Sequence, residues 1–170
     1  MYWIISDTHF GHRNLEHKCN RPILFEKNIL NGIKSMVKNS KKNDVLIHLG
    51  DIAFKNELVW HDTLTELFKE TGIKRWLVLG NHDNKSNHWY LNNGWDFVGE
   101  NITIKYKNKI ILFSHKPIKD NGYDFNIHGH FHNSDPTRHE PELVAIKNSK
   151  QILFCLEDNY KPISLDKLTV

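Results

Sequence analysis

Short apolar runs alternate with polar residues along this chain, and five of these runs end in side chains that can bind a cation. Each is followed by Asp, Asn or His, and together they span residues 4–9, 45–51, 78–83, 110–115 and 127–132. Apolar runs this short are typical of buried strands. Ligands of parallel sheets collect beyond the carboxyl ends of the strands, where these polar residues fall. The pattern therefore predicts a shared site, and its residue types indicate a metal.

Two longer segments have the period of an amphipathic helix. From Glu26 to Asn39 the apolar residues fall on one face, at Ile29, Leu30, Ile33, Met36 and Val37. The segment 56–71 repeats this period, and Gly72 is suited to cap its C-terminal end. These helices alternate with strands expected at 2–7, 45–49 and 75–79. The βαβαβ order predicts a parallel sheet with right-handed crossovers.

The pattern changes in the second half of the chain, where strand-like runs follow one another. After a short helix at 86–93, the runs 101–106 and 109–114 predict a hairpin joined by Lys107 and Asn108. We further expect a strand at 123–128, a loop at 133–141, a closing hairpin of 143–146 with 151–156, and a helical turn at 165–168. The segment 8–24 is too long for a simple connection, so it is either functional or mobile.

Length and composition predict one globular domain over residues 1–170. The chain lacks an apolar run long enough for a membrane span and has no secretory signal, so we expect a cytoplasmic protein. Its formal charge of +3 mildly favours an anionic substrate, but its lysines are scattered and form no nucleic-acid-binding stripe. Cys19 and Cys155 have no CxxC spacing and are expected to be reduced, with Cys155 a small buried side chain. No obligate protein partner is evident.

Histidine is unusually frequent, with twelve in the chain, and several lie at the ends of the strand-like runs. Asp7 and His9 are two residues apart, and in extended backbone such a pair points to one side. His130 and His132 have the same spacing, and Gly129 before them would let the backbone turn sharply. Each pair can therefore bind one cation.

Three further run ends complete a mixed set of oxygen and nitrogen ligands. Asp51 offers two carboxylate oxygens and could bridge two ions, Asn81 offers a carbonyl oxygen, and His115 offers an imidazole. Such a set without thiolate suits Mn²⁺, Fe, Zn²⁺ or Ni²⁺ rather than Ca²⁺. The ligands suffice for two ions, and a pair roughly 3.5–4 Å apart can clamp the attacking and leaving oxygens of a phosphoryl displacement.

The order of these motifs resembles the calcineurin-like metallophosphoesterase superfamily. Asp-x-His, Gly-Asp, Gly-Asn-His-Asp, a lone His after a strand and Gly-His-x-His follow one another between residues 7 and 132. The opening Ser-Asp-Thr-His-Phe-Gly-His, Asn14, Arg21-Pro22 and the ending Pro162-Ile163-Ser164-Leu165 are similar to compact members from bacteriophages and bacteria. The resemblance implies an α/β fold, a four-layer α/β/β/α sandwich with two mixed β-sheets. The strand pattern is compatible with this fold but does not establish it.

The resemblance also implies roles for individual residues. One metal would be held by Asp7, His9 and His132, and the other by Asn81, His115 and His130, with Asp51 bridging both. His82 would contact the substrate phosphate and protonate the leaving oxygen, and Asp83 would orient His82 by a hydrogen bond. The implied reaction is in-line attack of a metal-bound hydroxide on phosphorus, with Mn²⁺ expected before Fe, Zn²⁺ or Ni²⁺.

The remaining candidates lie outside the motifs' ligand positions. His12, Asn14 and Arg21 follow the first ligand pair in the long segment and are assigned to substrate binding, with a solvated loop as the alternative. An Arg there could grip a phosphate through two hydrogen bonds. We expect His48 to be structural, His128 to lie outside the site, and four histidines to be at the surface, namely His17, His61, His88 and His139.

These features favour a metal-dependent hydrolase of phosphodiesters, acting on a nucleotide or single-stranded nucleic acid. Protein Ser/Thr phosphatases of the superfamily carry Asp-Arg-Gly shortly after the bridging Asp, whereas Ile52-Ala53-Phe54-Lys55 follows Asp51 here. A phosphoprotein substrate is therefore disfavoured. A phosphomonoesterase of the same fold and a non-catalytic scaffold that binds a protein partner remain alternatives, and the complete ligand set together with His82 favours an enzyme.

Overall fold

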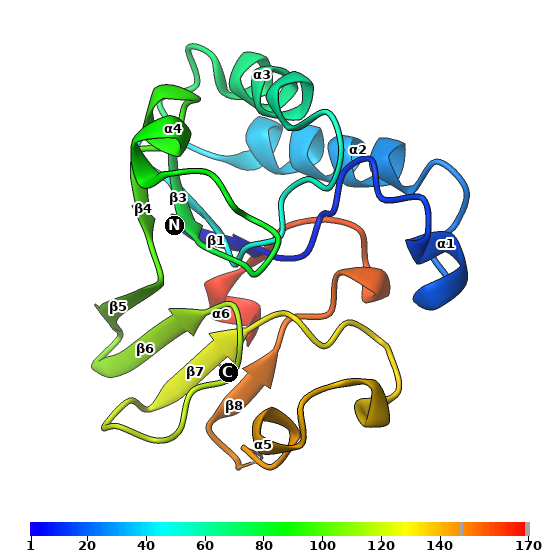
Figure 1. Cartoon of the computed structure of the whole chain (residues 1–170). Coiled ribbons are helices and arrows are strands. Elements are labelled where there is room, and N and C mark those ends of the chain that lie inside the picture. The colour runs from blue at the N-terminus through cyan, green and yellow to red at the C-terminus, as the bar shows by residue number, and fades with distance from the viewer. Residues whose placement is uncertain (147, 169–170) are drawn as a thin grey trace.

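The computed structural model describes residues 1–146 and 148–168, and it contains two β-sheets (Figure 1). The first has the order β4-β3-β2-β1-β9. Its strands are β1 (Tyr2–Ile5), β2 (Val45–His48), β3 (Lys74–Val78), β4 (Phe97–Gly99) and β9 (Ile163–Ser164). Strands β1 to β4 are parallel to their neighbours, whereas β9 is antiparallel to β1. The predicted βαβαβ unit is confirmed, with its strands adjacent in the sheet.

The second sheet has the order β5-β6-β7-β8 and is also mixed. Its strands are β5 (Asn101–Tyr106), β6 (Lys109–Ser114), β7 (Phe125–His128) and β8 (Gln151–Leu153). The β5–β6 hairpin is antiparallel, and β7 and β8 continue the sheet in parallel. Lys107 and Asn108 form its two-residue turn with φ of 45° and 62°, the backbone that matches the twist of a hairpin. The expected α/β fold with two mixed sheets is confirmed.

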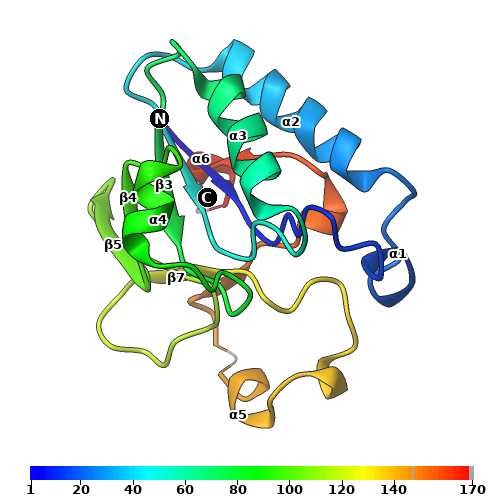
Figure 2. The ribbon, with the colours of Figure 1, turned by 45° about the horizontal axis from the view of Figure 1, so that its top comes forward.

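Helices α2 (Phe25–Asn39) and α3 (Glu57–Phe68) lie on one side of the first sheet, as Figures 1 and 2 show. Helix α2 buries the predicted face through Ile29, Ile33 and Met36. The shorter helices are α1 (Leu15–Lys18), α4 (Asn87–Asn92), α5 (Pro141–Val144) and α6 (Leu165–Leu168). Helix α5 lies on the opposite side of the molecule from α2 and α3. Short 3₁₀ turns cover 136–138 and 156–158.

One hydrophobic core joins both sheets. Ile4 and Leu77 of the first sheet and Phe113 and Ile127 of the second are fully buried in the same cluster. Strand β2 is buried along its whole length, as expected for a central strand covered on both faces. Among the described residues, no helix combines the length and the apolar character that a membrane span requires.

The expected closing hairpin is wrong. Residues 141–144 form helix α5, which begins with Pro141 at a position where a helix needs no backbone N–H. Strand β8 pairs in parallel with β7 instead. Strands β4 and β9 were not predicted, because runs of three and two residues are too short to show a period. The predicted helical turn at 165–168 is confirmed, and residues 169–170 lie outside the described residues.

Candidate metal centre

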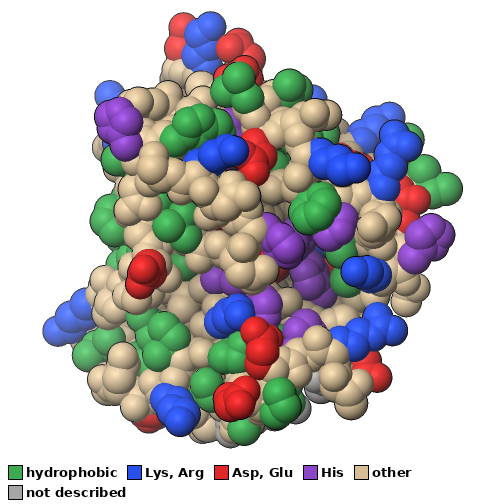
Figure 3. All heavy atoms as spheres, in the orientation of Figure 1, with side chains coloured by type: hydrophobic (Ala, Val, Ile, Leu, Met, Phe, Trp, Pro, Cys, Tyr) green, Lys and Arg blue, Asp and Glu red, His purple; other side chains and the backbone are tan. Residues whose placement is uncertain are grey.

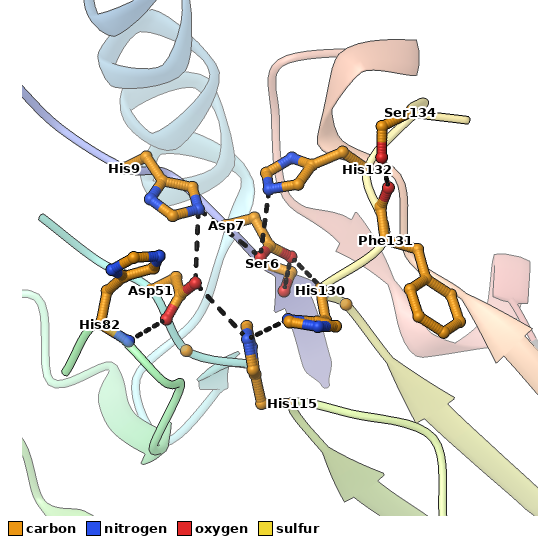
Figure 4. Close-up of polar contacts among 12 residues, drawn as sticks. Ser6, Asp7, His9, Asp51, His82, His115, His130, Phe131, His132 and Ser134 are labelled. Carbon is orange, nitrogen blue, oxygen red and sulfur yellow. Dashed lines mark hydrogen bonds and ion pairs between the residues drawn. The ribbon is translucent and has the colours of Figure 1, made fainter. Parts of the chain in front are cut away.

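The seven side chains expected as metal ligands lie together beyond the carboxyl ends of five strands, namely β1, β2, β3, β6 and β7. Figure 4 shows six of them pointing into a common space: Asp7, His9, Asp51, His115, His130 and His132. Since the strands belong to both sheets, the ligands approach this space from the two halves of the fold.

The first ligand group consists of Asp7, His9 and His132. Asp7 Oδ1 lies 3.9 Å from His9 Nε2 and 3.7 Å from His132 Nε2. This oxygen is buried and has no hydrogen-bond partner among the described residues. A buried carboxylate oxygen without a partner is costly unless a cation satisfies it. The group therefore has the donor atoms and the unsatisfied charge that a divalent metal ion would fit.

The second ligand group surrounds His115. Its Nε2 lies 3.0 Å from Asn81 Oδ1 and 3.1 Å from His130 Nδ1. Asp51 Oδ2 lies 3.4 Å from this nitrogen and also 3.4 Å from His9 Nε2, so it stands between the two groups. Asp51 is thus placed where one carboxylate could serve two ions.

Burial shifts the pKa values of carboxylate and imidazole side chains in both ligand groups. Burial, followed by the neighbouring carboxylates of Asp7 and Asp83, raises the pKa of Asp51 to about 7. Burial lowers the pKa of His130 to about 4 and holds the pKa of His9 well below its usual value. Neutral imidazoles keep their lone pairs free for a metal, and a bound cation would favour the ionised form of Asp51. The donor set therefore suits one or two divalent ions.

The backbone at the ligands is unusual. Five of them have positive φ angles: Asp7 (51°), His9 (45°), Asp51 (57°), His130 (72°) and His132 (51°). Residues other than Gly rarely adopt this left-handed backbone, and it concentrates at functional sites. The expectation of extended backbone at the two i, i+2 pairs is therefore wrong. In each pair both ligand residues have left-handed backbone, and a single residue separates them.

Two ligand imidazoles are held through their other ring nitrogen. His115 Nδ1 is 2.8 Å from the carbonyl oxygen of Leu49, and His132 Nδ1 is 2.9 Å from Glu157 Oε1. Such contacts fix the ring orientation and leave Nε2 directed at the metal position. Glu157 was missed from the sequence, because it belongs to none of the motifs and follows the last of them by 25 residues.

Arg21 lies behind the site rather than on the substrate side. Its guanidinium is fully buried and pairs with Glu157 at 2.7 Å. It also donates to the backbone carbonyl oxygens of Asp7 and Thr8 at 2.7 and 3.0 Å. The geometry does not support the expected grip on a phosphate. Arg21 instead fixes the backbone of the first ligand loop and the carboxylate that orients His132.

Asp83 also differs from its expected role. Its carboxylate accepts hydrogen bonds from the backbone amides of Asp51, Ile52 and Gly80 at 2.7–3.0 Å. Among the described residues, no hydrogen bond joins it to the imidazole of His82, so the expected orienting bond is absent. Asp83 therefore ties the loop after β2 to the loop after β3, where the ligand residues Asp51 and Asn81 lie.

The ligand groups open into a cavity of about 590 Å³. Figure 3 shows the histidines gathered in this hollow on the face of the molecule. His82 lies on its wall with its ring 5.3 Å from that of His9, and its backbone N–H donates to Asp51 Oδ1. Burial lowers the pKa of His82, against the opposing effect of Asp83. His82 thus lies beside the candidate ligand His9, with its side chain on the wall of the cavity.

The two other residues assigned to substrate lie at the edge of this cavity. His12 lines it, and its ring stacks on Phe54 at 3.9 Å. Asn14 is exposed and lines a neighbouring groove that His12 also borders. The structure therefore places His12 between the cavity and the groove, and Asn14 outside the cavity.

The remaining histidines fall into two kinds. His48 and His128 are buried and bonded to nearby protein groups, and His17 and His88 are exposed, as predicted. The prediction of a surface position is wrong for His61, which is buried and accepts from Trp95 Nε1 at 3.1 Å. His139 is partly exposed and lines the cavity, with its ring 5.5 Å from that of His130.

Both cysteines are free thiols, as predicted. Cys19 is buried at the cavity wall, whereas Cys155 is only half-buried, contrary to the expected buried position. Cys155 donates to Glu157 Oε2 at 3.3 Å. Burial, followed by the charge of Glu157, raises the pKa of Cys155 to about 12. A thiol in this state is a weak nucleophile, which argues against a catalytic cysteine here.

Two mixed sheets with carboxylate and imidazole side chains at their strand ends are the architecture and donor set expected of a metal-dependent phosphoesterase. The chain belongs to the calcineurin-like phosphoesterase family, whose model matches residues 2–163. The uncharacterized protein MJ1445 of Methanocaldococcus jannaschii is 30% identical over 178 residues, which cover 96% of this chain and 86% of that protein.

Two solved structures share the fold. The protein of unknown function AQ665 from Aquifex aeolicus matches with a TM-score of 0.70 and 30% identity, over 98% of this chain and 96% of that one. The Pseudomonas putida nuclease MPE matches with a TM-score of 0.56 and 18% identity, over 77% of this chain and 61% of the nuclease. At that identity the second likeness concerns the fold alone.

Proposed function

We propose that this chain is a phosphodiesterase that uses two divalent metal ions, with Mn²⁺ the first to test. The observation that carries the proposal is the position of Asp51, whose Oδ2 lies 3.4 Å from a histidine of each ligand group. Asp7, His9 and His132 would hold one ion, and Asn81, His115 and His130 the other. When bound, the ions would activate water and neutralise the charge that grows on the phosphoryl oxygens.

The protein's own groups would position the substrate and manage its proton. His82 stands on the cavity wall and would hold a proton on an imidazole nitrogen for the leaving oxygen. Asp83 keeps the loops after β2 and β3 together through three backbone amides. Asp51, Asn81 and His82, which lie in these two loops, would thereby be held in place before substrate arrives, which lowers the cost of reaching the transition state.

The shape of the site favours a diester over a monoester. A phosphodiester carries a substituent on each side of the phosphorus, so its site must be open in two directions. The cavity over the ligands meets the neighbouring groove at His12, and Lys18, Arg138 and His139 also line the cavity. Both ester groups could therefore leave the metal position without meeting the protein interior.

Hydrolysis of two chromogenic esters tests the proposal. Metal-free protein would be reloaded with Mn²⁺, Ni²⁺, Zn²⁺ or Mg²⁺ and assayed on bis-p-nitrophenyl phosphate and p-nitrophenyl phosphate. We expect metal-dependent cleavage with higher kcat/KM on the diester, reduced by His82→Ala and Asp51→Asn. His88→Ala, at an exposed position, is the matched control and should behave as the wild type. Higher activity on the monoester would favour a phosphomonoesterase, and no turnover with any bound metal would contradict the proposal.

A further inference from the structure

A second hollow, to which no particular group of the substrate has yet been assigned, adjoins the metal centre. This groove has a volume of about 460 Å³ and is lined by Gly11, His12, Arg13, Asn14, Phe54, Lys55, Asn56 and Trp60, together with Glu26. His12 borders both the groove and the cavity over the ligands, so the two hollows meet at this side chain. Any substituent that leaves the cavity on this side would enter the groove.

The groove wall nearest to the metal centre is aromatic. The ring of His12 stacks on Phe54 at 3.9 Å with an angle of 11° between the rings, and His82 meets Phe54 edge-on at 5.5 Å. Phe54 is nevertheless 41% exposed, although it is a large hydrophobic side chain. Trp60 stacks on buried Phe10 at 4.6 Å and lines the same groove. Two rings that the protein already holds in place thus border the groove.

The polar groups of the groove are free to bind a ligand. Within residues 1–146 and 148–168, the side-chain amides of Asn14 and Asn56 make no hydrogen bond. In the same part of the chain, Arg13 and Lys55 form no ion pair, so together they outweigh the one negative charge of Glu26. Amide groups can bind the edge of a nucleobase through both a donor and an acceptor. Cationic side chains can bind the phosphates of the same nucleotide.

We propose that this groove binds a nucleobase of a nucleotide or single-stranded nucleic-acid substrate, next to the scissile phosphate, with Phe54 as its stacking surface. The proposal rests on the proposed phosphodiesterase function and specifies its substrate class. Aromatic platforms combined with cations along the backbone are how proteins bind single strands without reading their sequence. Lys55 lies beside Phe54 in the chain and would contact a phosphate that flanks the stacked base.

Direct binding of a short oligothymidylate, labelled with fluorescein at its far end, tests the groove. Fluorescence anisotropy would be measured with Mn²⁺ present in the His82→Ala background, which slows cleavage and keeps every expected metal ligand. Adding Phe54→Ala should weaken binding about tenfold, within the range expected for one lost base–aromatic stack. Phe97→Ala is the matched control, since Phe97 is 44% exposed on β4, away from the groove. Equal affinities of the two variants, or no binding at all, would overturn the proposal.

The salt dependence of this binding provides a second readout. Lys55→Ala should reduce the slope of log K against log salt by about 0.7, the value for one lost contact to a single strand. Lys105→Ala removes an exposed lysine of β5 and should keep the wild-type slope. An unchanged slope in Lys55→Ala would show that Lys55 does not contact a phosphate of the bound strand.

A kinetic comparison separates failure of the groove from failure of the proposed reaction. Thymidine 5′-(p-nitrophenyl phosphate) and methyl p-nitrophenyl phosphate share a leaving group and differ only in the group that would enter the groove. Phe54→Ala should lower kcat/KM for the thymidine ester more than for the methyl ester. The ratio of the two kcat/KM values should fall by about tenfold relative to the wild type. If the ratio of kcat/KM for the thymidine ester to kcat/KM for the methyl ester equalled that of the wild type, the proposal that the groove binds a nucleobase would be overturned. Lack of hydrolysis of both esters by metal-loaded wild type would overturn the phosphodiesterase function, while the binding comparison would still decide the groove.

Discussion

At the residue scale, Glu157 shows how the candidate centre depends on a side chain outside every motif. It accepts from His132 Nδ1 at 2.9 Å and pairs with Arg21 at 2.7 Å. Burial alone would raise the pKa of Glu157, but the hydrogen bond from His132 and the charge of Arg21 lower it to about 2. Glu157 is therefore ionised at neutral pH, which strengthens His132 as a donor to a metal.

Glu157→Gln keeps the size of this side chain and removes its charge. We expect metal affinity to fall by about 10- to 100-fold, the usual cost of losing a partner behind a histidine ligand. The free energy of unfolding should also fall by about 3 kcal/mol, because the buried guanidinium of Arg21 loses its counter-ion. Isothermal titration with Mn²⁺ and urea denaturation measure the two effects. Asp158→Asn, at the exposed neighbouring position, is the control; equal metal affinities of the two variants would contradict this role.

His61 provides a prediction for the pH dependence of stability. Burial, followed by the charge of Arg75, lowers the pKa of His61 to about 4, whereas an unfolded histidine titrates near pH 6.5. Between these values the unfolded chain binds more protons, so the stability contribution is present above about pH 6.5 and is lost as the pH falls towards 4.

His61→Gln keeps an acceptor for Trp95 but cannot be protonated. Between pH 7 and pH 5, the wild type should lose about 1–2 kcal/mol more of its unfolding free energy than this variant. Urea denaturation with a chelator present measures the difference without metal binding. His88→Gln, at an exposed position, should follow the wild type. Parallel curves for the wild type and His61→Gln would show that His61 does not titrate in this range.

The sequence specifies the candidate ligands better than their surroundings. Asp7, Asp51 and His115 could be placed because motif order and strand ends mark them, and the structure brings them within reach of one another. The partners of Arg21 and Asp83 could not be predicted, since both bind backbone groups of distant loops. Only the folded chain shows which carbonyl or amide such a side chain meets.

At the element scale, the strand ends are brought together by glycines that leave room for neighbouring chains. A Cβ atom at Gly129 would lie 2.0 Å from Ser6 Oγ and 2.2 Å from Asp7 Oδ2. A Cβ at Gly80 would lie 2.1 Å from Asp51 Oδ1. Gly129 is not among the residues with positive φ, so the expected sharp turn is not its reason. It is required because β7 ends directly against the first ligand loop.

Gly129→Ala should displace Asp7 while the two sheets remain folded. We expect kcat/KM to fall by about a hundredfold, because a shift of about 1 Å in a reacting group has that effect. Metal content by atomic emission and activity on bis-p-nitrophenyl phosphate measure the change. Gly99→Ala is the control, since its Cβ would meet only Phe97 and Asn101 at 3.2 Å or more. Full activity in Gly129→Ala would mean that the loops tolerate a wider separation.

The strands and helices that the sequence could predict have a clear apolar period, or are β-rich runs that flank a short turn. The apolar face of α2 and the Lys107–Asn108 turn were found because their signals are local. Strand β9 has only two residues and exists because it pairs with β1 from the other end of the chain. Strand β8 lies in parallel beside β7, a pairing that local patterns do not specify.

At the scale of the whole molecule, the candidate metal centre lies where the two sheets meet. Asp7, His9, Asp51 and Asn81 follow strands of the first sheet, whereas His115, His130 and His132 follow strands of the second. A metal bound to both sets would therefore connect the two sheets in the folded state only. Folding and metal binding should be thermodynamically linked as a result.

Metal addition should consequently stabilise the whole fold. With free Mn²⁺ at a hundred times its Kd, the free energy of unfolding should rise by about 2.7 kcal/mol for a single site that exists only in the folded protein. Differential scanning calorimetry with chelator and with Mn²⁺ would measure the shift in Tm. Asp51→Asn should reduce this shift more than Asp62→Asn on helix α3, because Asp51 stands between both ligand groups. If Mn²⁺ raised the Tm of the two variants equally, the ion would be bound elsewhere. The position of Asp51 between the ligand groups would then have no part in its binding.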